Sequence, residues 1–84
     1  MSWRVVLTDR ARRDLRRLDR QIATRVIAAL ERFASDGTGD VVRLRGSDEL
    51  RLRVGDWRVR FRSQYSDQAV QVLRILPRGH AYRD

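Results

Sequence analysis

The sequence from Leu50 to Arg62 reads LRLRVGDWRVRFR, and this stretch decides the fold of the C-terminal half of the chain. Apolar residues and arginines alternate on both sides of the Gly55-Asp56 pair. Successive side chains of a strand point to opposite faces, so this alternation predicts two paired β-strands joined by a tight turn. One face of the hairpin is then apolar, and the other carries five arginines: Arg51, Arg53, Arg58, Arg60 and Arg62.

Further strands and two helices are predicted around this hairpin. The run 69–76, which ends before Pro77, predicts a third strand, and the β-rich residues 3–7 predict an N-terminal one. Thr8 and Asp9 are good helix N-caps. Beyond them, apolar residues recur at three- and four-residue spacing, which indicates two amphipathic helices with a break near 19–21 and an end before Gly37.

These elements predict one α+β domain over residues 1–84. Its expected order is an N-terminal strand, a two-helix hairpin and a three-strand antiparallel meander, with both helices packed on the apolar face of one antiparallel sheet. Trp3 and Trp57 fall on the apolar side of the alternation, so we expect them to be core residues rather than base-stacking platforms.

Composition limits the classes of function. The chain has 84 residues, with 19 basic residues against 11 acidic ones, and every basic residue is arginine. GC-rich coding is one interpretation of the lack of lysine, but it does not account for the net charge of +8, which predicts a polyanionic partner. With no cysteine and one histidine, the sequence excludes disulfides and argues against a structural zinc site. No signal peptide or apolar membrane span is seen, so we expect a cytoplasmic protein with no membrane partner.

The arginine face of the hairpin is the candidate binding surface. Paired like charges repel each other, which is tolerated when the face is solvated, neutralised by acids or used to bind an anion. The nearby acids Asp48, Glu49 and Asp56 are expected at the ends of the hairpin rather than along it. Arginine binds phosphates through bidentate contacts, so we interpret the face as a phosphate-binding surface, with a merely solvated face as the alternative.

Five segments follow one another along the chain: ARRDLRRL at 11–18, LRG at 44–46, GDWRVRF at 55–61, VLRI at 72–75 and a tail with Arg78, Tyr82 and Arg83. In the order and spacing of these segments, the chain resembles the RelE/ParE toxins of bacterial type II toxin–antitoxin systems. The LRG and WRVRF segments are more similar to the RelE branch. The resemblance implies a RelE-like microbial ribonuclease-type fold and a toxin that cleaves mRNA, usually in the ribosomal A site.

The resemblance also implies site residues. Arg51, Arg53, Arg58, Arg78 and Tyr82 match the catalytic positions of the family, whose reaction is attack of the ribose 2′-hydroxyl on the adjacent phosphate without metal or other cofactor. Arginine does not give up its proton, so Arg51 and Arg53 are better phosphate clamps than bases. Histidine is the side chain that most often transfers protons near neutral pH, and His80 lies two residues from Tyr82, which makes it a candidate acid or base. Four further arginines are expected to contact RNA: Arg45, Arg60, Arg62 and Arg83.

The partners implied are a cognate antitoxin protein, mRNA and the ribosome with its 16S rRNA, and operator DNA only through the antitoxin. Two other functions stay open. One is inhibition of DNA gyrase, as in the ParE branch, and the other is RNA binding by a catalytically weak toxin homologue.

Overall fold

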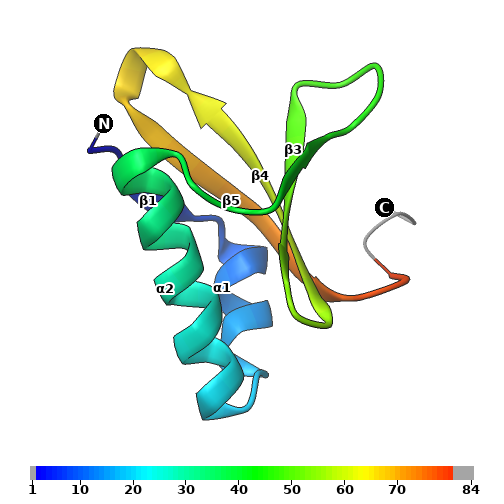
Figure 1. The fold of residues 1–84 in the computed structure, drawn as a ribbon. Coiled ribbons are helices and arrows are strands. Elements are labelled where there is room, and N and C mark those ends of the chain that lie inside the picture. Colours follow the sequence, from blue (N-terminus) through cyan, green and yellow to red (C-terminus); the bar gives the residue numbers. More distant parts are fainter. Residues whose placement is uncertain (1, 81–84) are drawn as a thin grey trace.

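The computed structural model describes residues 2–80 and has two helices and a five-stranded mixed sheet (Figure 1). Neither helix in these residues is long and apolar enough to span a bilayer. The elements follow in the order β1 (Arg4–Leu7), α1 (Asp9–Arg16), α2 (Arg20–Asp36), β2 (Val41–Arg43), β3 (Glu49–Val54), β4 (Trp57–Gln64), a 3-10 turn (Tyr65–Asp67) and β5 (Ala69–Pro77).

The predicted α+β fold class is confirmed, and the sheet differs from the prediction in two respects. Its strand order is β1-β5-β4-β3-β2, and β1 pairs with β5 in parallel, so the sheet is mixed rather than wholly antiparallel. The strand β2 was not predicted. It has three residues, too few to show an alternating pattern, and it forms because Val41 pairs with Leu52 and Arg43 with Leu50 of β3.

The helix boundaries agree with the predicted signals. The Thr8 hydroxyl accepts a hydrogen bond from the Ala11 amide at 3.1 Å and donates to the Leu73 carbonyl at 3.1 Å, so the N-cap of α1 also binds β5. The helix α2 begins after Asp19 and ends at Gly37, whose φ of 79° lies in the left-handed region that glycine tolerates without strain. The predicted break and the predicted end of the second helix are confirmed.

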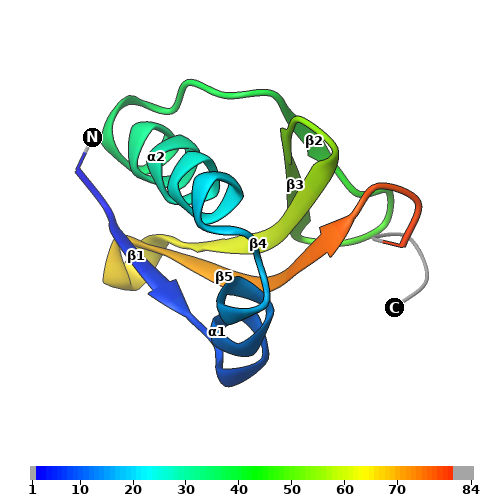
Figure 2. The same cartoon turned by 90° about the horizontal axis from the view of Figure 1, so that it is seen from below.

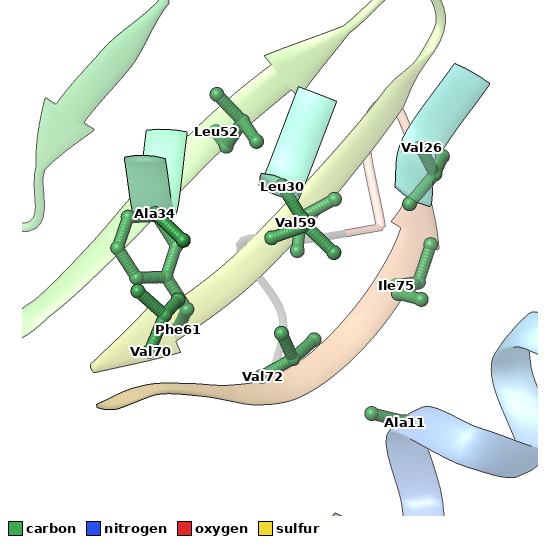
Figure 3. Close-up of a cluster of buried hydrophobic side chains, with 10 residues drawn as sticks. All are labelled: Ala11, Val26, Leu30, Ala34, Leu52, Val59, Phe61, Val70, Val72 and Ile75. Atoms are coloured by element: carbon green, nitrogen blue, oxygen red, sulfur yellow. The ribbon is translucent and has the colours of Figure 1, made fainter. Parts of the chain in front are cut away.

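The hydrophobic core lies between α2 and the apolar face of the sheet (Figures 2 and 3). Val26 and Leu30 of α2 share one buried cluster with Val59 and Phe61 of β4, and all four are at most 2% exposed. Ala11 of α1 joins the same core at the end of β1. The half-buried residues packed against this core include Trp3 and Trp57, as predicted.

Candidate functional site

The β3–β4 register gathers the five arginines of the hairpin on the face opposite the core. Leu52 lies opposite Val59 on the apolar face, while on the other face Arg51 lies opposite Arg60 and Arg53 opposite Arg58. The Gly55-Asp56 pair forms the turn, in which Gly55 has a φ of 57°. The predicted segregation of apolar and charged side chains is therefore confirmed.

Asp48, Glu49 and Asp56 lie at the ends of the hairpin, as predicted, but the arginine face is paired with acids to an extent that the sequence did not indicate. The Glu49 carboxylate is buried and accepts hydrogen bonds from Arg60 Nη2 on both oxygens, at 2.9 and 3.0 Å. The Arg62 guanidinium lies 3.3 Å from Asp48, and the Arg53 guanidinium forms an ion pair with Asp40. These arginine–acid contacts come from strand pairing. Register places Glu49 opposite Arg62, diagonal to Arg60, and the pairing of β2 with β3 brings the preceding loop alongside Arg53.

The five arginines differ in burial, with Arg58 half-buried between two extremes. Arg51 and Arg60 are only 7% and 9% exposed, so these two lie within the packed structure. The Arg53 side chain is 61% exposed, and Arg62 is exposed as well. The predicted RNA contact Arg60 therefore has a structural partner in Glu49, whereas Arg53 and Arg62 reach solvent.

An open groove of about 810 Å³ lies at the turn end of the hairpin. Here the β3–β4 turn comes close to the end of β5 (Figure 1), and the Arg78 amide donates to the Asp56 carbonyl at 2.8 Å. A smaller pocket of about 180 Å³ adjoins it and adds Arg51 and Val42. The larger groove, of about 810 Å³, is lined by Asp40, Arg53, Gly55, Asp56, Arg58, Arg78 and Gly79.

The groove brings together most of the predicted catalytic arginines. Arg53 comes from β3, Arg58 from β4, and Arg78 from the turn after β5, so three separate segments supply guanidinium groups. Arg58 is held in place, because its Nη1 donates to the carbonyls of Gly55 at 2.9 Å and Trp57 at 3.0 Å. Three guanidinium groups around one open groove form a site suited to a phosphate.

The remaining predicted residues lie elsewhere. His80 is exposed in the turn that follows β5, where its amide donates to the Pro77 carbonyl at 3.0 Å, and it is not among the groove lining. Arg45 is exposed in the loop between β2 and β3. Tyr82 and Arg83 lie outside the described residues.

Two groove residues, Asp40 and Asp56, were not predicted as part of the site. Asp56 was predicted as a residue of the hairpin turn, and no role was assigned to Asp40. The sequence signal for Asp40 is its position directly before the β-branched pair Val41-Val42, which forms the strand β2. Across residues 2–80, no three histidine, cysteine, aspartate or glutamate side chains lie together in a way that would hold a metal ion.

Comparisons with known proteins bear on the family and the fold of the chain. A family model described as the ParE toxin of a type II toxin–antitoxin system, parDE, matches residues 5–82. A search of curated protein sequences found no match.

Solved structures of toxin–antitoxin complexes share the fold. The archaeal RelE–RelB complex from Pyrococcus horikoshii has a chain that is 26% identical with a TM-score of 0.80, and the match covers 94% of this chain and 98% of that one. The RelBE2 complex from Mycobacterium tuberculosis has a chain that is 27% identical with a TM-score of 0.74, covering 93% and 100%. The RelBE complex of E. coli, at 17% identity, TM-score 0.75 and coverage of 90% and 96%, shows the fold alone.

Proposed function

This chain belongs to the ParE toxin family of type II toxin–antitoxin systems, within the RelE/ParE superfamily, and we propose that it is a metal-independent endoribonuclease that cleaves mRNA on the ribosome. Cleavage of the message would inhibit translation. Because translation takes place in the cytoplasm, the toxin would act there. Its nucleic-acid partners would be mRNA and the 16S rRNA of the ribosome.

The observation that supports this proposal best is the convergence of Arg53, Arg58 and Arg78 on one open groove. Attack by a ribose 2′-hydroxyl on the adjacent phosphate passes through a phosphorane-like state with extra negative charge on its oxygens. Preorganised guanidinium groups stabilise such charge as it develops, and they need no reorganisation at the moment of reaction. Holding the 2′-oxygen in line with the phosphorus supplies the second part of the rate enhancement.

In this proposal the arginines differ in their roles. Arg53, Arg58 and Arg78 clamp the scissile phosphate, and Arg51 extends the positive potential through the smaller pocket. The exposed Arg45 and Arg62, together with Arg83, bind the flanking RNA backbone. Tyr82 and His80 are proposed to orient the reacting groups or to transfer protons. The products are a 2′,3′-cyclic phosphate and a free 5′-hydroxyl.

We also propose that a cognate antitoxin covers the arginine face, and that operator DNA is bound only through this antitoxin. The matching chain from Pyrococcus horikoshii belongs to a RelE–RelB complex, and the one from Mycobacterium tuberculosis belongs to the toxin–antitoxin complex RelBE2. A free surface with this charge would bind cellular RNA without selection, so a masking protein also has a physical reason.

The test is cleavage mapping in a translating extract. The toxin should cut mRNA within codons and leave 5′-hydroxyl ends, and Arg58→Ala should abolish the cuts. The matched control is Arg32→Ala, which removes an exposed arginine from α2, outside the groove lining. Intact mRNA in the presence of the folded wild-type toxin would refute the proposal.

Inhibition of DNA gyrase is the second candidate, because the family model that matches residues 5–82 is that of the ParE toxin. A supercoiling assay separates the two functions. Inhibited supercoiling with intact mRNA selects the gyrase function. RNA binding without cleavage or gyrase inhibition selects a catalytically weak homologue, with an affinity that falls by a log–log slope of about −0.7 per phosphate contact as salt rises.

A further inference from the structure

The groove at the turn end of the hairpin needs a proton acceptor that its arginines do not provide. Cleavage by the 2′-hydroxyl removes a proton from that group, and a guanidinium stays protonated at any pH a protein experiences. Among the described residues that line the groove, the side chains able to accept a proton are the carboxylates of Asp40 and Asp56. Asp40 and Asp56 are therefore the candidate proton acceptors of the groove.

Asp40 is held in position by both its backbone and its side chain. Its carbonyl accepts a hydrogen bond from the Arg53 amide at 2.9 Å, which anchors it beside β3. Its Oδ2 forms the ion pair with the Arg53 guanidinium, while Oδ1 has no hydrogen-bond partner among residues 2–80. The side chain is 48% exposed, so an incoming ribose hydroxyl can reach the carboxylate.

The neighbours of Asp40 are the groups expected to hold the scissile phosphate. Asp40 lines both the groove and the smaller pocket, so Arg51, Arg53 and Arg58 face it from β3 and β4, and Arg78 and Asp56 face it across the groove. The guanidinium groups outnumber the carboxylates, which offsets the repulsion between a carboxylate and a bound phosphate. Asp56, in contrast, lines only the larger groove, where its carbonyl holds the Arg78 amide.

We propose that the Asp40 carboxylate is the general base of the cleavage reaction, a proposal that rests on the ribonuclease function proposed above. Asp40 takes the proton of the ribose 2′-hydroxyl as the 2′-oxygen bonds to phosphorus and the bond from phosphorus to the 5′-oxygen breaks. The 5′-oxygen takes a proton from water, and the hydroxide is neutralised when Asp40 releases the proton it accepted. Arg53 orients the carboxylate and binds the phosphate, so one side chain aligns base and substrate.

The test compares Asp40→Asn, Asp40→Glu and Asp48→Asn in single-turnover cleavage of ribosome-bound mRNA. Asp48→Asn is the matched control, since it also removes one aspartate charge and one exposed ion pair with an arginine, outside the groove. Loss of general base catalysis should slow Asp40→Asn by about 10²- to 10⁴-fold with unchanged binding to the ribosome. Asp40→Glu should recover part of the rate, and Asp48→Asn should cleave like the wild type.

A substrate with a 5′-bridging sulfur separates the base from the acid. Its thiolate leaves without a proton, so it rescues a variant that lacks the general acid but not one that lacks the general base. Asp40→Asn should remain as slow, relative to the wild type, on this substrate as on normal RNA. Rescue by the sulfur substrate, or full activity of Asp40→Asn on normal RNA, would overturn the assignment. A wild-type toxin that cleaves no RNA would instead overturn the proposed function itself.

Discussion

Replacing Glu49 by glutamine is expected to destabilise the protein strongly, because it breaks the buried ion pair with Arg60. The two side chains are 12% and 11% exposed, and Arg60 Nη2 lies 2.9 and 3.0 Å from the two carboxylate oxygens. Glutamine keeps the shape but removes the charge, so the Arg60 guanidinium, buried directly opposite Arg51, loses the negative charge of Glu49.

The magnitude follows from the burial of the pair. Removing one partner of a buried ion pair costs about 3–5 kcal/mol, since it leaves a desolvated charge uncompensated. That is a large share of the roughly 5–15 kcal/mol that stabilises a typical domain. For a chain of this size each kcal/mol lowers Tm by about 4–8 °C, so a drop of at least about 12 °C is expected.

The assay is urea and thermal unfolding, followed by the fluorescence of Trp3 and Trp57. Asp48→Asn serves as the control, because it removes one negative charge from an exposed ion pair. The Asp48 side chain is 78% exposed, and that of its partner Arg62 is 47% exposed. An exposed pair contributes about 0–1 kcal/mol, so this variant should unfold almost like the wild type. The double variant Glu49→Gln/Arg60→Met should recover much of the loss, since an apolar pair needs no counter-charge. Equal and small losses in Glu49→Gln and Asp48→Asn would refute the reasoning.

Two further variants test the turn of the hairpin and the end of α2. Gly55→Ala should lower the free energy of unfolding by about 1–2 kcal/mol, because φ is +57° and the added Cβ would lie 3.0 Å from Arg25 Nη2; an unchanged urea midpoint would contradict this. Hydrogen bonds from the Thr38 hydroxyl and amide lower the pKa of Asp36 below its ordinary value of 3.8, so they stabilise the folded state above that pH and cease to do so as the carboxyl is protonated. Thr38→Val should therefore be less stable than the wild type at neutral pH and equally stable well below pH 3.8, and urea titrations in which the difference persists in acid would show the reasoning to be wrong.

The sequence by itself determined the main elements and the face on which the arginines lie. The alternation around Gly55-Asp56 determines the hairpin and which of its faces is apolar. A shift of the strand register by one residue would turn every apolar side chain to solvent. The helices could be predicted from their apolar spacing, and the end of the second helix from Gly37. Both signals act between residues that are close together along the chain.

Only the tertiary structure decided which arginines are exposed to solvent and which acids form ion pairs with them. The strand β2 is too short to carry a pattern, yet its pairing with β3 places Asp40 beside Arg53. The Glu49 carboxylate reaches Arg60, eleven residues away, only because the two strands are in register. Such contacts depend on long-range pairing rather than on local periodicity, so the alternation that predicts an arginine face does not reveal how that face is neutralised or where its open groove lies.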